Sequence, residues 1–244
     1  YPRMFSSLAV HGQTLAFIYD NDIWLSSLSG GSARRLTQAP GKESALRFSP
    51  DGQWLAFSAN YGDNTDVYVM PAQGGEARRL TWHPGRDVVV GFTPNGRVMF
   101  YSERGRFVPQ TTQLYSIAAT GGVPERVPVP SGTKAALSAG GRTLAYTPNR
   151  EVFGQWKNYR GGTQSRLWLM NMSDYSVKEV PKPAGGSNDT DPMWIGDTLY
   201  FNSDRNGEFN LFRYDAAGEA AQLTQLKDFP VTDPSGDGAG SIVF

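Results

Sequence analysis

Residues 45–60 read ALRFSPDGQWLAFSAN, in which alternating apolar residues run into a Pro-Asp-Gly turn and continue as a second alternation. This pattern predicts a β-hairpin. Asp51-Gly52 supplies the positive φ that a tight hairpin turn requires, and Pro50 restricts the backbone before it. The bulky side chains of both strands, of which Trp54 is the largest, need a further surface because a hairpin alone cannot bury them.

The same hairpin returns along the chain. Stretches 10–22, 91–103, 136–149 and 193–204 keep a turn glycine and an aromatic residue in the second strand. The aromatic recurs at one equivalent position, about 40 to 55 residues apart: Phe17, Phe57, Phe100, Tyr146, Phe201 and Phe244. Such spacing is typical of propeller blades. We therefore predict an all-β propeller of four-stranded antiparallel blades.

Each repeat divides into four strands, a to d. A second aromatic marks strand c in five repeats: Trp24, Tyr68, Tyr115, Trp168 and Phe212. The sequence Arg-Arg-Leu-Thr closes strand d at Thr37 and again at Thr81. As a single domain over residues 1–244, the blades are predicted at 4–37, 38–81, 82–128, 129–181 and 182–225, with a partial sixth at 226–244. Because a propeller closes its ring, we expect the polypeptide to continue beyond Phe244; a closing strand from elsewhere is the alternative.

Composition limits the functional classes. The 28 glycines and 16 prolines among 244 residues suit short strands joined by tight turns. A formal net charge of zero gives no support for a nucleic-acid partner, and no apolar run is long enough to span a membrane. The absence of cysteine excludes disulfides, thiolate nucleophiles and cysteine-ligated zinc.

The loops between strands b and c, and between d and a, share one face of the predicted disc and differ most between repeats. The longest of them, 148–165, reads PNREVFGQWKNYRGGTQS. Loops beyond about 12 to 15 residues are usually functional or disordered, and the aromatic residues of this one indicate that it is ordered.

Trp156, Lys157, Tyr159 and Arg160 of this loop combine aromatic and cationic groups, and the following Gly-Gly allows close approach of a partner. We predict contact with a peptide, a neighbouring domain or a subunit, with Arg160 binding a carboxylate. The structural alternative is that the aromatics plug blade interfaces and that Arg160 binds local carbonyls.

Arg86, Arg104 and Arg106 fall on the same predicted face. Together with the two cations of the long loop they would form a positive rim suited to acidic groups or a peptide C-terminus. Scattered, solvated surface arginines are the alternative.

No catalytic, metal or cofactor site is predicted. The acidic residues lack the DxDxDG spacing of a calcium loop, so hydrogen bonds at turns and strand ends are expected of them: Asp20, Asp22, Asp63, Asp66, Asp189, Asp191 and Asp204. His11 and His83 lie on opposite predicted faces and no GxSxG elbow is present, which argues against a Ser-His pair. A glycosidase or polysaccharide lyase with carboxylates at the central channel is a weaker alternative.

The repeats FSPDGQWLAF from Phe48 and FTPNG from Phe92 resemble those of TolB-like propellers. A likeness to a second family covers nearly the whole chain. The stretches DIWLSSLSGGSARRLT, NYGDNTDVYVMPAQGGEARRLTWHPG, WKNYRGGTQSRLW and DTDPMWIGDTLYFNSDRNGEFNLF resemble the N-terminal six-bladed propeller of tricorn proteases and their bacterial homologues.

The resemblance implies a parent polypeptide with a second propeller, a PDZ domain and a serine peptidase core that carries the catalytic Ser and His. This propeller would then bind or gate oligopeptides and pack against that core. In the family a basic loop near the start of blade 3 helps to hold a peptide's C-terminus; here the loop is short and Arg86 is its only cation.

A TolB-like protein-binding module without protease activity is the alternative function. Another copy of the chain, in a homo-oligomer, is a further candidate partner. The bacterial homologues favour a periplasmic or exported location, with the cytoplasm as the alternative.

Overall fold

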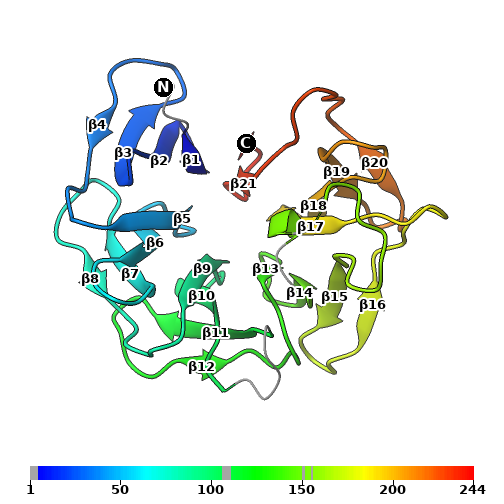
Figure 1. Ribbon diagram of the computed structural model, residues 1–244, viewed down its shortest axis with the longest axis horizontal. Helices are drawn as coiled ribbons and strands as arrows, with labels where there is room; N and C mark the ends of the chain where they lie inside the picture. Colours follow the sequence, from blue (N-terminus) through cyan, green and yellow to red (C-terminus); the bar gives the residue numbers. More distant parts are fainter. Residues whose placement is uncertain (1–4, 106–110, 150–151, 155) are drawn as a thin grey trace.

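The computed structural model describes residues 5–105, 111–149, 152–154 and 156–244, and it is a ring of antiparallel sheets around a central axis (Figure 1). Five sheets have four strands each, and in every one the strands follow one another from the axis outward. The predicted all-β propeller is therefore confirmed.

The first three blades have the following strands. Blade 1 contains β1 (Ser6–His11), β2 (Thr14–Tyr19), β3 (Asp22–Ser27) and β4 (Arg34–Arg35). Blade 2 contains β5 (Lys42–Phe48), β6 (Trp54–Asn60), β7 (Asp66–Pro71) and β8 (Arg78–Arg79). Blade 3 contains β9 (Asp87–Phe92), β10 (Arg97–Ser102), β11 (Gln113–Ala118) and β12 (Glu125–Arg126).

The remaining strands form blades 4 and 5 and a final two-stranded hairpin. Blade 4 contains β13 (Lys134–Leu137), β14 (Thr143–Thr147), β15 (Trp168–Asn171) and β16 (Val177–Glu179), with a short 3-10 turn η1 (Val152–Gly154) before β15. Blade 5 contains β17 (Asp189–Ile195), β18 (Thr198–Ser203), β19 (Asn210–Tyr214) and β20 (Ala220–Gln222). The two-stranded hairpin β21 (Ser235–Gly236) and β22 (Ile242–Val243) lies between blades 1 and 5 (Figure 1). No helix in the described ranges is long and apolar enough to cross a membrane.

An aromatic pair joins strands b and c in all five complete blades. The two aromatics that the sequence repeats place in these strands lie directly opposite each other: Phe17 and Trp24, Phe57 and Tyr68, Phe100 and Tyr115, Tyr146 and Trp168, Phe201 and Phe212. The ring centroids are 5.7 Å apart in blade 2 and 5.8 Å apart in blade 3, with the rings stacked. Phe244 follows β22 and is partly exposed; the described residues contain no strand c beside it.

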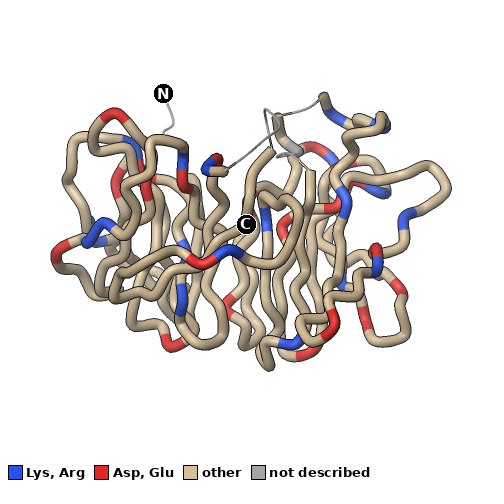
Figure 2. Tube along the Cα trace, turned by 90° about the horizontal axis from the view of Figure 1, so that it is seen from below, with Lys and Arg blue, Asp and Glu red and all other residues tan. Residues whose placement is uncertain are grey.

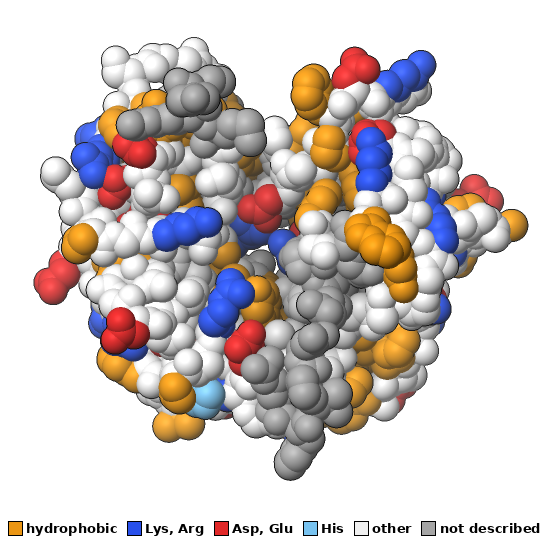
Figure 3. All heavy atoms as spheres, in the orientation of Figure 1, with side chains coloured by type: hydrophobic (Ala, Val, Ile, Leu, Met, Phe, Trp, Pro, Cys, Tyr) orange, Lys and Arg blue, Asp and Glu red, His pale blue; other side chains and the backbone are white. Residues whose placement is uncertain are grey.

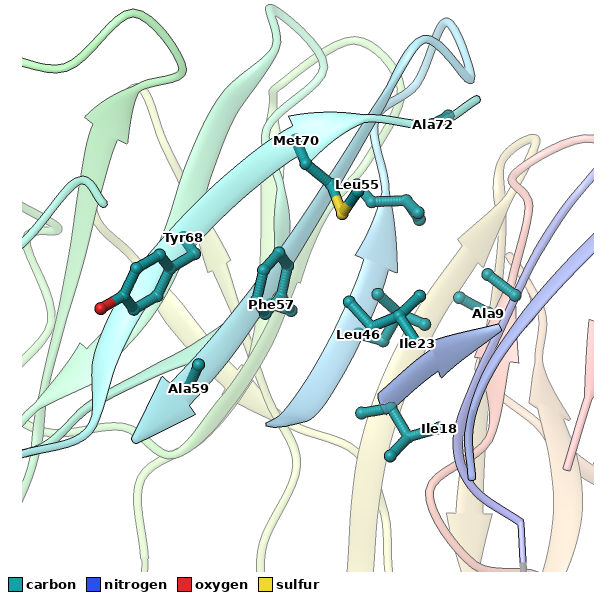
Figure 4. Close-up of a cluster of buried hydrophobic side chains, with 11 residues drawn as sticks. Ala9, Ile18, Ile23, Leu46, Leu55, Phe57, Ala59, Tyr68, Met70 and Ala72 are labelled. Atoms are coloured by element: carbon teal, nitrogen blue, oxygen red, sulfur yellow. The ribbon is translucent and has the colours of Figure 1, made fainter. Parts of the chain in front are cut away.

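The core lies between blades and not within them. Figure 4 shows Phe57 and Leu46 of blade 2 pointing toward Ile23 of blade 1, and all three are buried in one cluster. Four further clusters repeat this arrangement around the ring. Each sheet thus buries the side chains of its neighbour, which explains why a single hairpin is insufficient.

The Arg-Arg-Leu-Thr repeat fastens the two-residue outer strand. The second arginine, Arg35 or Arg79, binds the carboxylate at the start of strand c, with 2.6 Å between Arg79 Nη2 and Asp66 Oδ2. The threonine hydroxyl accepts the amide of the residue after that aspartate, 3.0 Å between Val67 N and Thr81 Oγ1. We call the side-chain pair between strands c and d the c–d clamp.

The c–d clamp recurs with other residues. In blade 3 Arg126 Nη2 donates to Gln113 Oε1 at 2.9 Å. In blade 4 the charges are exchanged, and Arg166, two residues before strand c, binds Glu179 of strand d at 3.0 Å. The first arginine of the repeat links neighbouring blades, since Arg34 Nη2 donates to the carbonyl of Gln73 at 2.9 Å.

We expect Arg79→Ala to lower the free energy of unfolding by about 2 to 3 kcal/mol, because it leaves the buried Asp66 carboxylate without its cation. Partial exposure of Arg79 keeps the loss below that of a fully buried pair. Urea unfolding measures the change. Arg166→Ala is the matched control, since both members of its clamp are partly exposed and the expected loss is below about 1 kcal/mol. Equal losses in the two variants would contradict this account of the clamp.

Candidate functional site

The long blade 4 loop is anchored on blade 5. Arg160 Nη1 lies 2.7 Å from Asp204 Oδ2, and Arg160 also donates to the carbonyl oxygens of Tyr159 and Asp204. Asp204 is fully buried and accepts two further bonds from Asn188, at 2.7 Å from its amide and 2.9 Å from Nδ2. The carboxylate partner predicted for Arg160 is thus an internal one.

Gly161 of this loop packs closely against the ring of Tyr159. A Cβ added at Gly161 would lie 2.0 Å from the phenol oxygen of Tyr159. Tyr159 itself is half-buried, and its carbonyl accepts from Asn188 Nδ2 at 2.9 Å. The sequence Tyr-Arg-Gly therefore forms a folded unit that fixes the loop on the face opposite the Pro-Asp-Gly turns.

The other two predicted loop residues differ in exposure. Lys157 pairs with Glu208 of blade 5, whose side chain is buried. Trp156 is 85% exposed, so its indole faces solvent. Of the four predicted binding residues in this loop, Arg160 and Lys157 are tied to blade 5, and Trp156 presents a free surface.

The predicted arginine rim is only partly present. Arg104 pairs with buried Asp87 and lies over the rings of Phe100 and Tyr115, 5.4 and 5.2 Å from their centroids. Arg205 occupies the equivalent position of blade 5, bound to Asp189 at 3.1 Å. The guanidinium of Arg104 is therefore used inside its own blade.

The two remaining arginines of the predicted rim have different outcomes. Arg86 is exposed on the loop face, where its carbonyl accepts the amide of Glu103 at 3.2 Å. Arg106 lies outside the described residues. The described residues of this set lie in loops of one face, but Arg104 and Arg160 each bind a buried carboxylate and do not form a common rim. Figure 2 shows basic and acidic residues interspersed along the edges of the disc.

Exposed apolar side chains of two segments lie around the start of β19. We define the loop-face patch as Phe153, Trp156, Leu226 and Phe229, all of which are exposed, Phe229 to 78%. Both contributing segments attach at the start of β19: Phe153 packs on Phe209 with ring centroids 4.9 Å apart, and Asn210 Nδ2 donates to the carbonyl of Leu226 at 3.0 Å. Figure 3 shows hydrophobic side chains beside the central opening on this side of the disc.

A cluster of four charged side chains lies on the axis, which the sequence analysis missed. We call Arg47, Lys134, Asp191 and Asp233 the axial charge cluster. Arg47 Nη2 is 2.9 Å from Asp233 Oδ1, and Lys134 Nζ is 3.1 Å from Asp191 Oδ1 and 3.6 Å from Asp233 Oδ1. The residues come from blades 2, 4 and 5 and from the segment before β21, and Asp233 joins the cations of blades 2 and 4, which are not neighbours.

Bulges in the innermost strands accompany the cluster. The registers of β5 and β17 shift between Ser44 and Arg47 and between Thr190 and Met193. Asp191 and Asp233 both have positive φ, 50° and 43°, and a bulge re-aims side chains in this way. The sequence does carry a signal, because Thr-Asp-Pro occurs at 190–192 and again at 232–234.

The protein surrounds the cluster, although Arg47 and Asp233 keep 14% and 32% of their side-chain surface in contact with solvent. Burial alone would raise the pKa of Asp233, but the charges of Arg47 and Lys134 outweigh it and lower this pKa. Burial would likewise lower the pKa of Arg47, and Asp233 reverses the effect and raises it. The pair between Arg47 and Asp233 is therefore charged at neutral pH.

A cavity of about 490 Å³ lies on the axis between the cluster and the a–b turns. Its walls include Phe48, Phe92, Leu137 and Trp194, one from each of four blades, and Arg47, Lys134 and Asp191 reach its inner end. A cavity of this size with mostly apolar walls is typical of small-ligand sites.

The histidines are separated as predicted. His11 contacts the Pro50 carbonyl at the a–b turns, with 3.3 Å from Nε2 to the oxygen, while His83 Nδ1 accepts from the amide of Gly85 in a d–a loop. Within the described ranges, no three His, Asp or Glu side chains are grouped to hold a metal ion.

Residues 2–244 match the family profile described as "Tricorn protease N-terminal beta propeller domain". The chain belongs to this family. A tricorn protease homologue of Streptomyces coelicolor is 31% identical over 232 residues, covering 94% of this chain and 22% of that protein. A homologue from Saccharolobus solfataricus is 26% identical and also extends well beyond the match, with 22% of its length covered.

Solved structures share this fold. The crystal structure of the tricorn protease matches with a TM-score of 0.85 at 24% identity, covering 98% of this chain and 24% of that one. A TolB protein of Agrobacterium tumefaciens matches with a TM-score of 0.74 at 19% identity, covering 92% and 82%. This tricorn-type propeller thus spans about a quarter or less of the tricorn proteins that it matches.

We expect Arg160→Ala to release the loop from blade 5, because Asp204 then loses its cation while keeping both Asn188 donors. Hydrogen exchange should become at least about tenfold faster at the amides of Tyr159 and Gln164, which bond within the loop. Arg142→Ala, on the opposite face, is the control and should leave the exchange rates of these amides unchanged. Lys182 would not serve, because its side chain contacts the same segment. Unaltered exchange in Arg160→Ala would contradict the anchoring role.

The Asp233 pKa predicts an acid-dependent loss of stability. Because the folded-state pKa is lowered, the stabilisation is complete above the unfolded value of about 4 and is lost as the pH falls below it. Urea unfolding between pH 2.5 and 7 should show a shallower acid loss in Asp233→Asn than in the wild type. Asp63→Asn, in an exposed loop, serves as control and should keep the wild-type profile. Identical profiles for all three proteins would refute the assignment.

Proposed function

We propose that this propeller is a non-catalytic domain of a tricorn-like serine peptidase that binds or gates oligopeptides and packs against the protease core. Membership of the tricorn N-terminal propeller family supports it, together with relatives that are four to five times longer than the match. Catalytic Ser and His would lie in other domains of the parent, alongside its PDZ domain and second propeller.

The loop-face patch is the observation that carries the packing part of this proposal. Large exposed apolar groups gathered on one face of a domain usually mark an interaction site. Trp156 and Phe229 supply the large aromatic area that anchors interfaces. The anchoring of the loop through Arg160 and Lys157 limits the conformational entropy lost on association.

A TolB-like protein-binding module without a protease is the second candidate. The similarity to the Agrobacterium tumefaciens TolB protein, of which 82% is covered, favours it. The same patch would serve there for a separate protein partner, so the two candidates differ in whether the partner belongs to the same polypeptide.

Substitution of Trp156 tests the packing in the full-length parent polypeptide. Trp156→Ser should increase hydrogen exchange or protease cleavage by about tenfold in segments 156–164 and 224–231, because it removes the most exposed aromatic of the interface. Val123→Ser is the matched control, since Val123 is 84% exposed at a c–d turn of blade 3 on the other face. Equal behaviour of the two variants would reject the loop face as the packing surface.

A further inference from the structure

The axial cavity has an inner end that carries no net charge. Two cations, Arg47 and Lys134, face two carboxylates, Asp191 and Asp233, within ion-pair distance. The one further carboxylate on the cavity wall, Asp237, accepts the amides of Ala239, Gly240 and Ser241 at 2.8 to 2.9 Å. A charged guest would have to break one of these pairs to gain another, so charge gives it no advantage.

The cluster also closes the axis at that level. Its ion pairs form one continuous series: Arg47 of blade 2 and Lys134 of blade 4 both bind Asp233 of the segment before β21, and Lys134 also binds Asp191 of blade 5. Figure 3 shows charged side chains within the central opening of the disc. The cavity on the a–b side is therefore blind.

The wall offers apolar and aromatic surface at repeated positions. Four residues near the ends of strands a line the cavity: Phe48, Phe92, Leu137 and Trp194. Each pairs with the strand b residue two positions before the repeated aromatic residue. Trp194 is held in place by a bond of 3.1 Å from its Nε1 to the carbonyl of Ala136. A volume of about 490 Å³ accommodates one or two side chains of a peptide.

We propose that the axial cavity is a blind binding site for an uncharged aromatic or aliphatic side chain at the end of an extended peptide, closed at its inner end by the axial charge cluster. The inference deepens the proposed peptide binding and rests on it only for the guest being part of a peptide. The cavity on the propeller axis then ends at the axial charge cluster and does not continue to the other face.

Binding of blocked amino acids by the purified chain tests the site. Isothermal titration with N-acetylphenylalanine amide should show at least about tenfold tighter binding than N-acetylaspartate amide or N-acetyllysine amide, a difference of about 1.4 kcal/mol. Phe92→Ala, in the wall, should weaken the phenylalanine derivative by at least about fivefold. Trp156→Ala, on the opposite face, should leave it unchanged. Equal affinity for the three compounds, no saturable binding, or no effect of Phe92→Ala would overturn the proposal.

A charge variant tests the inner end separately. In Asp233→Asn two cations face one carboxylate, so N-acetylphenylalanine with a free carboxylate should bind at least about tenfold tighter than its amide, whereas the wild type should show no such preference. An unchanged preference would show that the guest does not reach the cluster. Because these experiments involve neither the loop-face patch nor a protease, their failure leaves the packing proposal standing, and failure of the packing proposal leaves the cavity intact.

Discussion

The aromatic pair between strands b and c is the contact on which the ring depends. Phe57 and Tyr68 lie side by side in one sheet, but the surface that buries them includes Ile23 of the preceding blade. A four-stranded blade therefore cannot bury its own apolar side chains, and each sheet is stable only when a neighbouring sheet covers it. This requirement sets the blades around an axis and leaves their loops and inner strands free to vary.

The blades differ most from one another in the segments that the packing between sheets constrains least. On the loop face, the blade 4 loop is held by Arg160 on Asp204 and leaves Trp156 in solvent. On the axis, Arg47 of β5 contacts Asp233 of the segment before β21. The net charge of zero gives no sign of either arrangement, in which Arg160 and Arg47 are each paired with one carboxylate. The faces differ in chemistry as a result: exposed aromatic surface on one, and an apolar cavity with a neutral inner end on the other.

Repetition made the fold predictable from the sequence. The strand b and strand c aromatics, such as Phe100 and Tyr115, recur at fixed spacing, and the c–d clamp is visible in Arg-Arg-Leu-Thr. The site was less accessible because its contacts join residues that no repeat relates. Arg47 and Asp233 are 186 positions apart, Arg47 in an inner strand and Asp233 in the segment before one. Arg104 was expected to face outward because the buried position of its partner Asp87 is not evident from spacing alone.

The exchanged charges of the blade 4 clamp bear on how similar strands find the correct neighbour while the chain folds. Strand c of blades 1 and 2 begins with Asp22 or Asp66, whereas strand d of blade 4 ends in Glu179. Pairing those strands in error would oppose two carboxylates, and pairing Arg166 with Arg35 or Arg79 would oppose two guanidinium groups. The exchanged charges thus distinguish blade 4 from blades 1 and 2. Pairing of strand c of blade 4 with strand d of blade 1 or 2, or the reverse, is disfavoured during folding, although the repeats are similar in sequence.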